Sequence, residues 1–132
     1  MPARLPPFCL CLLLLLSGLA PGLPGAPRAA AQETRYFEEL PDLPVMPGLA
    51  EAEAAGIAFD KPGGRIVTLY ALGAPAPAAV RAFYAETLPA LGWRPDGARA
   101  WRRAGERLTL ETRRDPRVRD GATVARFTLA PE

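Results

Sequence analysis

The sequence predicts an α+β fold, a two-layer sandwich in which one long helix packs on a curved antiparallel sheet of four to five strands. Two patterns within the 132 residues predict it. Apolar residues at helical spacing form one stripe within residues 78–91, and short runs rich in β-branched and aromatic residues lie before and after that stripe. The predicted order is therefore two strands, the helix, and then three or four antiparallel strands.

The two strands before the helix are predicted to form a hairpin. Ile57–Phe59 is a short apolar run, Lys61–Gly64 has the composition of a turn, and Arg65–Leu72 is rich in β-branched and aromatic residues. We expect the second strand to turn its even-numbered residues toward the core, although Val67 and Leu69 make its other face nearly as apolar. A strand that is apolar on both sides is expected to have its second face covered as well.

The helix is predicted from one apolar stripe and from the residues at its ends. Pro77 suits the first turn, and Gly92 suits the position just after the last turn. Pro89 lacks the N–H that would bond to the carbonyl of Ala85, so we expect regular helix to end near Leu88. The stripe consists of Val80, Phe83, Tyr84, Leu88 and Leu91.

The C-terminal third is predicted as a meander of strands over Ala100–Arg103, Glu106–Arg113 and Thr123–Leu129. A two-residue loop at Ala104–Gly105 fixes the register of the first two, and directly opposed residues share a face. The expected pairs are Arg103–Glu106, Arg102–Arg107 and Trp101–Leu108 across that loop, and Leu110–Ala125 and Leu108–Phe127 across the last two strands. The predicted core consists of Phe59, Ile66, Thr68, Tyr70, Val80, Phe83, Tyr84, Leu88, Leu91, Trp93, Trp101, Leu108, Leu110, Phe127 and Leu129.

Residues 1–31 have the layout of a secretory signal peptide. Arg4 supplies the positive start, Phe8–Ala20 is an apolar stretch of 13 residues, and a Pro/Gly/Ala segment ends at Ala31. The apolar stretch is shorter than the roughly 20 residues of a membrane-spanning helix. We therefore expect cleavage after Ala31, a periplasmic or secreted product and no transmembrane span after cleavage; an uncleaved anchor is the alternative.

The remaining chain is predicted to divide into an acidic, proline-rich extended arm over residues 32–55 and an α+β domain over residues 56–132. Residues 32–60 carry a net charge of −6 and residues 61–132 a net charge of +6. Attraction between them favours an arm that lies across the domain. The alternative is a solvated leader, but the arm contains seven large apolar residues, which favours docking.

Three motifs resemble those of small exported bacterial proteins that have no characterised function. Phe83–Trp93 reads F-Y-x3-L-P-x-L-G-W, a helix-to-strand signature; Leu43–Leu49 reads L-P-V-M-P-G-L, and Phe59–Arg65 forms a turn of the type F-D-x-P-x-G-R. The resemblance spans roughly residues 36–103. It implies the fold and export, and it implies no chemistry.

Composition argues against an enzyme. After residue 31 the chain contains no histidine, no cysteine and no serine. The one serine of the sequence, Ser17, lies in the predicted signal peptide. Thiol and imidazole chemistry, the usual zinc ligands and the common hydrolase triads are therefore not available. Asp60 and Arg65 face each other across the hairpin turn, where an ion pair that stabilises the turn is the favoured interpretation. We expect no catalytic residue, no metal site and no cofactor.

Basic residues near the C-terminus are the candidate binding site. They form an outward stripe that leads into a loop and would suit phosphate or carboxylate groups: Arg102, Arg107, Arg113, Arg114, Arg117 and Arg119. A solvated strand face balanced by Glu111, Asp115 and Asp120 is the plainer interpretation. An envelope protein or anionic lipid headgroups fit the predicted compartment, whereas nucleic acid does not.

Two functions from different classes follow. One is a non-catalytic interaction module of the bacterial envelope that binds another protein. The other is a carrier of a small ligand or lipid, with an apolar pocket between helix and sheet. The packing beneath the helix distinguishes them, because a carrier needs a cavity there and an interaction module does not.

Overall fold

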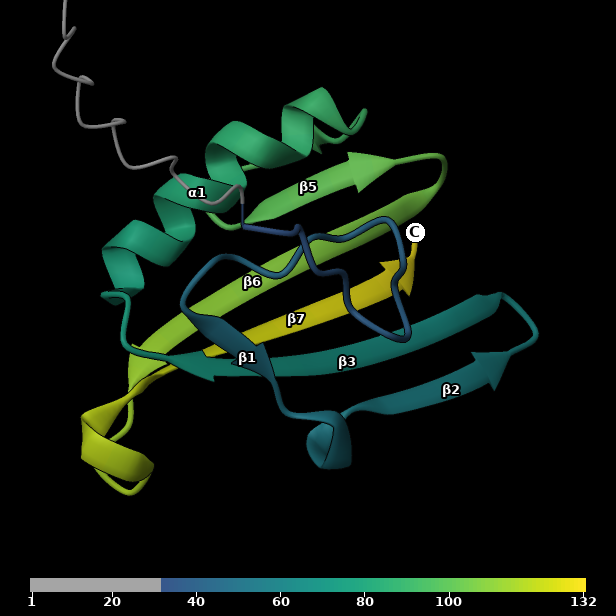
Figure 1. The fold of residues 1–132 in the computed structure, drawn as a ribbon. Helices are drawn as coiled ribbons and strands as arrows, with labels where there is room; N and C mark the ends of the chain where they lie inside the picture. Colours follow the sequence, from purple (N-terminus) through teal and green to yellow (C-terminus); the bar gives the residue numbers. More distant parts are fainter. Residues whose placement is uncertain (1–31) are drawn as a thin grey trace, which may run out of the picture. The chain divides into compact units, whose positions relative to one another are not determined.

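The computed structural model describes residues 32–132 (Figure 1). The predicted signal peptide and its cleavage site lie outside the described residues. Within the described part, no helix has the length and apolar character needed to cross a membrane. The elements in chain order are β1 (Leu49–Glu51), the short 3-10 helix η1 (Glu53–Ala55), β2 (Ile57–Lys61), β3 (Gly64–Gly73), α1 (Pro77–Ala90), β4 (Arg94–Pro95), β5 (Ala100–Arg103), β6 (Glu106–Arg114), η2 (Arg119–Gly121) and β7 (Thr123–Pro131).

The α+β architecture is confirmed, with α1 packed on one antiparallel sheet. The sheet has the order β1-β3-β7-β6-β5-β4, and β2 pairs with β3 beside β1. It has seven strands because two short strands, β1 in the arm and β4 after the helix, join the predicted ones. A strand of two or three residues has too little alternation for a sequence pattern to show it.

The helix carries its predicted stripe into the core. Val80, Tyr84 and Leu88 are fully buried. Gly92 has a φ of +87°, the left-handed conformation expected after a helix end. The helix includes Pro89 in its last turn, so it ends two residues later than expected.

The strand register is confirmed at the short turn and shifted at the long one. All three expected pairs across Ala104–Gly105 are present. Between β6 and β7, Leu108 pairs with Leu129 and Leu110 with Phe127, two residues away from the expected register. The two-residue turn fixes its pairing, whereas the loop of residues 115–122 leaves the register free to shift by two without changing which face is buried.

The acidic arm is docked, as its apolar residues indicated. Phe37, Leu43 and Val45 are buried in the same core as the helix. The ring of Phe37 lies 5.1 Å from that of Phe127, which lies 4.8 Å from that of Tyr84. These three rings therefore join arm, sheet and helix.

Two hydrogen bonds from Tyr84 hold the arm against the helix. Its hydroxyl donates to the carbonyl of Pro44 over 2.8 Å and accepts from the N–H of Met46 over 3.1 Å. Burial raises the pKa of Tyr84 well above its ordinary value, so the phenol stays neutral.

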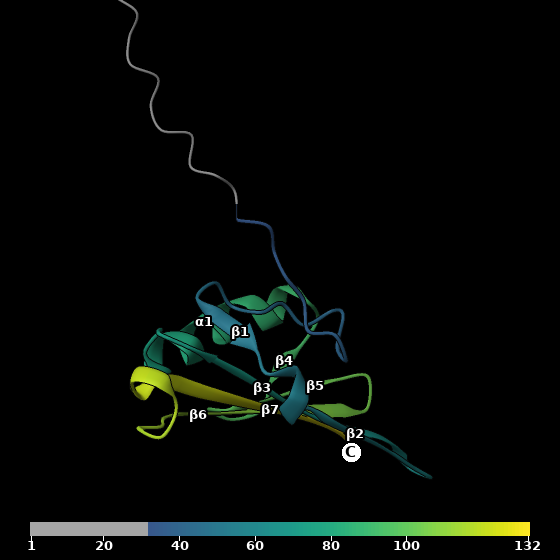
Figure 2. The same cartoon turned by 60° about the horizontal axis from the view of Figure 1, so that its bottom comes forward.

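The prediction for the hairpin face is wrong. In β3 the odd-numbered residues 67, 69 and 71 are buried, whereas Ile66, Thr68 and Tyr70 are only half-buried. The arm lies on the same side of the sheet as α1, so it covers the odd-numbered face and leaves the other face open (Figure 2). Phe59, predicted in the core, is 61% exposed.

Candidate functional site

The fold leaves the face of the sheet opposite α1 and the arm uncovered (Figure 2); we call it the open face. Strand register places its side chains in rows that cross the sheet. The rows are Ile57–Thr68–Thr128–Thr109–Ala100, Tyr70–Arg126–Glu111 and Leu72–Val124–Arg113, with Phe59–Ile66 at one corner and Ala130–Arg107–Arg102–Arg94 at another.

One side of the open face is apolar. Phe59 and Ile57 on β2 are 61% and 50% exposed, the most exposed large apolar side chains of the described residues together with Tyr36. Ile66 and Tyr70 on β3 lie beside them and are half-buried. Exposed aromatic and aliphatic side chains grouped on one face are typical of a surface that binds a partner.

The other side of the open face is basic. Arg94, Arg102 and Arg107 occupy neighbouring positions on three adjacent strands. Asp96 accepts from Arg102 Nε over 2.8 Å and lies 3.4 Å from Arg107 Nη1, and a carboxylate oxygen of Glu132 lies 2.9 Å from Arg102 Nε. The hydrogen bond with Asp96 is the main cause of the raised pKa of Arg102.

A second basic group lies at the far end of the face. Arg99, Arg113 and Arg126 line a concavity of ≈ 370 Å³ together with Tyr70 and Val124. Their charges are partly matched, because Arg126 pairs with Glu111 at 3.2 Å and Arg113 with Asp115 at 2.9 Å. Most of these guanidinium groups stay exposed, so they can exchange these partners for an incoming carboxylate or phosphate.

The residues of the predicted arginine stripe lie in two parts of the structure, three on the strands and three at the end of β6 and in the loop that follows. Arg102, Arg107 and Arg113 lie on the open face, as alternation along the strands required. Arg114, Arg117 and Arg119 do not continue it: β6 ends at Arg114, and the chain turns there into the loop of residues 115–122.

Local bonds explain this turn. Asp115 accepts the N–H of Arg117 over 3.0 Å, which lowers the pKa of its carboxyl, and Arg114 donates to the carbonyl of Gly121 over 3.1 Å.

The predicted ion pair between Asp60 and Arg65 is replaced by another one. The two residues are opposed in the hairpin, but Arg65 pairs with Glu39 of the arm.

Three arginines of the open face were not among the predicted site residues. Arg126 lies between the buried residues Ala125 and Phe127, so alternation in the last strand was enough to find it. Arg94 and Arg99 had no such signal, because they lie in or beside very short strands.

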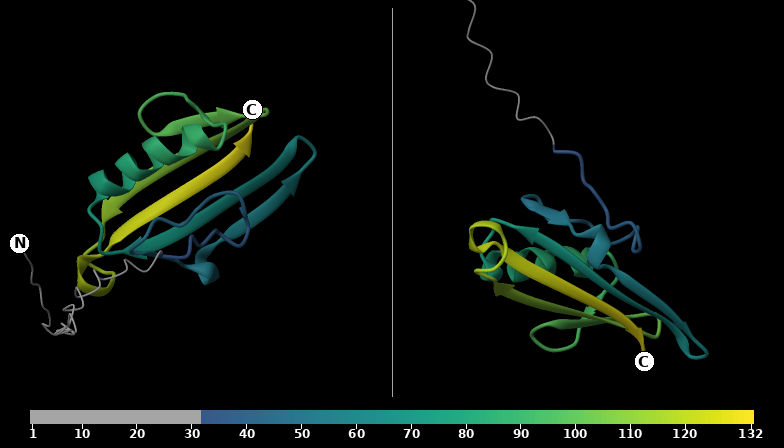
Figure 3. Two further views of the ribbon diagram at one scale, coloured as in Figure 1. Left: turned by 45° about the horizontal axis from the view of Figure 1, so that its top comes forward. Right: turned by 90° about the horizontal axis from the view of Figure 1, so that it is seen from below.

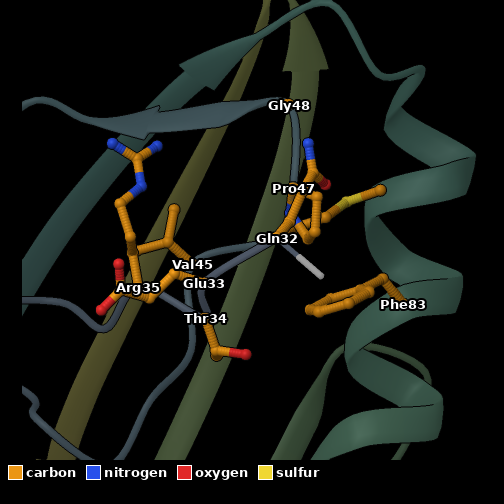
Figure 4. Close-up of a pocket in the computed structure, with 9 residues that line it drawn as sticks. Gln32, Glu33, Thr34, Arg35, Val45, Pro47, Gly48 and Phe83 are labelled. Atoms are coloured by element: carbon orange, nitrogen blue, oxygen red, sulfur yellow. The ribbon is translucent and has the colours of Figure 1, made fainter. Parts of the chain in front are cut away.

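Two further concavities lie on the covered side of the sheet. The first, of about 400 Å³, lies between the arm and α1, and its apolar lining consists of Val45, Met46 and Pro47 of the arm and Phe83 of α1 (Figure 4). The second, of ≈ 260 Å³, lies beneath the arm, where Arg103 pairs with Asp42 and stacks 4.3 Å from the ring of Trp93. Neither lies between the rings of Phe37, Tyr84 and Phe127.

No group of three carboxylates, cysteines or histidines within residues 32–132 is placed to hold a metal ion. The open face presents charged and apolar side chains.

Compared with models of protein families, with curated proteins and with solved structures, the chain has no match.

Proposed function

We propose that this protein is a non-catalytic, exported interaction module of the bacterial envelope whose open face binds an acidic surface of a partner protein. One observation carries the proposal. The same uncovered face presents exposed Phe59 and Ile57 and also the row of Arg94, Arg102 and Arg107. Aromatic residues and arginine are the types enriched where proteins bind one another.

The distribution of charge supports an acidic partner. The outward side chains of β4 to β7 include five arginines, against Glu111 on the face and Asp96 and Glu132 at its rim. Two carboxylates of the arm lie on the other side of the sheet, where Glu39 and Asp42 pair with Arg65 and Arg103. The arm therefore holds much of the acidic charge away from the open face.

Packing favours this proposal over a carrier with a pocket between helix and sheet. Phe37, Tyr84 and Phe127 occupy that layer with centroid separations of 4.8 and 5.1 Å, and each is at most 1% exposed. A ligand in this layer would have to displace them, at a cost of several kcal/mol for each aromatic side chain. The concavity in Figure 4 lies outside this layer, between arm and helix.

The test is affinity capture from the native envelope with two charge-matched variants. The face variant replaces Arg102, Arg107 and Arg113 by glutamine, and the loop variant replaces Arg114, Arg117 and Arg119. Both lose three positive charges. We expect the face variant to weaken capture of an acidic protein at least about tenfold and the loop variant to leave it nearly unchanged.

Melting temperatures should stay close to that of the unaltered protein, because the side chains of Arg102 and Arg113 are 50% and 69% exposed in their ion pairs. Equal losses in both variants would show attraction by overall charge, and unchanged capture in the face variant would remove the arginine row from the proposal. Capture of anionic vesicles instead of a protein would identify the membrane as the partner. N-terminal sequencing of the exported protein tests cleavage of the predicted signal peptide, and Gln32 is expected to be the first residue.

A further inference from the structure

The two edges of the sheet differ in how they are protected against another strand. The β4 edge is two residues long and contains Pro95, which has no N–H to donate. The β2 edge is five residues long, contains no proline and is exposed throughout. Among residues 32–132, β2 pairs with β3 alone, so its other edge has no strand beside it.

The side chains of β2 make this edge attractive to a second strand. Ile57 and Phe59 project on the open face, and Ala58 between them is small. The β2–β3 hairpin reaches beyond the end of α1, and of the arm only η1, at the start of β2, lies near this edge (Figure 3). Unpaired main-chain groups next to exposed apolar side chains are the features by which strands are added to sheets.

The sequence of β2 is complementary to itself in the antiparallel direction. A two-fold axis perpendicular to the sheet keeps each face on its own side, so residues that oppose each other must be an even number of positions apart. With the axis at Ala58, Ile57 of each copy lies opposite Phe59 of the other. Asp60 then lies opposite Gly56, which carries no charge.

Other centres of symmetry are poorer. An axis at Phe59 would place Ile57 opposite Lys61, an apolar residue against a charge. The axis at Ala58 instead places Lys61 opposite Ala55 of η1, two residues from the opposite charge of Glu53. An aliphatic–aromatic pair directly opposed across two strands stabilises the pairing, and it forms twice in this arrangement.

We propose that β2 pairs with β2 of a second copy of this chain, antiparallel and centred on Ala58, so that the two sheets become one. The inference goes beyond the proposed function and does not depend on it. The open faces of the two copies become continuous, and a dimer presents two arginine rows on the same side of one sheet. Two linked sites bind a repeated or extended partner more tightly than one.

The first test measures self-association by sedimentation equilibrium of the purified protein in the form that accumulates after export. Phe59→Lys is compared with Tyr36→Lys, because Tyr36 is 52% exposed and lies in the arm, away from β2. Both variants lose one exposed aromatic side chain and gain one positive charge. We expect Phe59→Lys to raise the dimer dissociation constant at least about tenfold and Tyr36→Lys to leave it unchanged.

A cross-link tests the register. In a chain with Cys9→Ala and Cys11→Ala, Ala58→Cys is expected to form an intermolecular disulfide on mild oxidation, because the two residues face each other across the axis. Lys61→Cys is the control, since its two copies would be about 20 Å apart.

Cross-linking of Lys61→Cys but not Ala58→Cys would overturn the register. An unaltered protein that stays monomeric at its highest soluble concentration would overturn the dimer, as would equal dissociation constants for the two lysine variants. A monomer that instead binds an extended peptide along β2 would show that the occupant is another protein. None of these results bears on the arginine variants, so the two proposals fail separately.

Discussion

On the face of the sheet beneath α1 and the arm, Phe127 and Leu69 are 0% and 1% exposed, whereas their neighbours along the same strands, Arg126 and Tyr70, reach solvent on the open face. The covered face is apolar almost throughout, and its side chains pack against α1 and the arm. The open face carries arginines, threonines and a group of exposed apolar residues. Adjacent residues of one strand thus lie in environments that differ as much as core and surface.

The difference shows how a small chain can be both stable and available for binding. Side chains alternate between faces, so β3, β6 and β7 place one set of residues in the core and the other at the surface. The stabilising contacts lie on one face, and substitutions on the other should leave the fold intact. Stability and binding are therefore expected to respond to different residues.

The largest expected contrast between the faces comes from two phenylalanines. Phe127→Ala removes the ring that touches both Phe37 and Tyr84, so we expect a loss of about 3–5 kcal/mol in the free energy of unfolding. Phe59→Ala on the open face should change it by less than about 0.5 kcal/mol, because that ring is already in solvent. Urea denaturation measures both, and similar losses would mean that the open face is covered in solution.

The next effect concerns the hydrogen bonds that fix the arm to the helix. Tyr84→Phe leaves the carbonyl of Pro44 and the N–H of Met46 without the hydroxyl, and the expected loss is about 1–3 kcal/mol. Tyr70→Phe on the open face is the matched control, with little change expected. Increased hydrogen exchange of the Met46 amide in Tyr84→Phe would locate the effect in the arm.

Alkaline pH provides a separate test of the same group. The pKa of Tyr84 is raised in the folded chain, so its contribution to stability is full below the pKa of an unfolded tyrosine, about 10, and decreases as pH rises above that value. Tyr84→Phe should therefore lose less stability than the unaltered protein between neutral pH and pH values above about 10. Parallel curves for the two proteins would contradict burial of this phenol.

The covered face shows which features of the fold the sequence could predict. The spacing of Val80, Tyr84 and Leu88 predicted the helix face, and a two-residue turn fixed the pairing of Trp101 with Leu108. The buried side of β3 was not predictable in the same way, because both sides of that strand are apolar. The position of the arm determines which side of β3 is buried, and the arm has no regular sequence pattern that shows where it docks.

The candidate site was predictable to a similar extent. Alternation along β5 and β6 placed Arg102, Arg107 and Arg113 on one face, but no sequence pattern showed the direction in which the loop carries Arg117. The loop begins there because Asp115 bonds to the chain that follows it. That Phe59 belongs to the site depended on which face of the sheet the arm covers.

A smaller effect tests the apolar character of the covered face. The hydroxyl of Thr123 is fully buried and has no hydrogen-bond partner within the described residues. Because Thr123→Val keeps the shape and removes that hydroxyl, we expect a gain of about 1 kcal/mol in the free energy of unfolding. Thr128→Val on the open face, where the residue is half-buried, is the control and should give no comparable gain. A loss in Thr123→Val would mean that its hydroxyl is bonded in solution.

The smallest effect lies where the two faces meet, at the end of β6. Asp115 is held by the N–H of Arg117 and by exposed Arg113, and its folded pKa is lowered. A carboxyl with a lowered pKa stabilises the fold above its unfolded pKa, about 4, and that contribution is lost as pH falls through the folded pKa. The melting temperature of Asp115→Asn should therefore lie slightly below that of the unaltered protein at neutral pH and converge with it in acid. Because Arg113 lies on the open face, Asp115→Asn also frees its guanidinium there, and capture of an acidic partner should be maintained or strengthened while stability falls. A variant that lost stability and capture together would show that the geometry of the loop, rather than the charge of the face, governs binding.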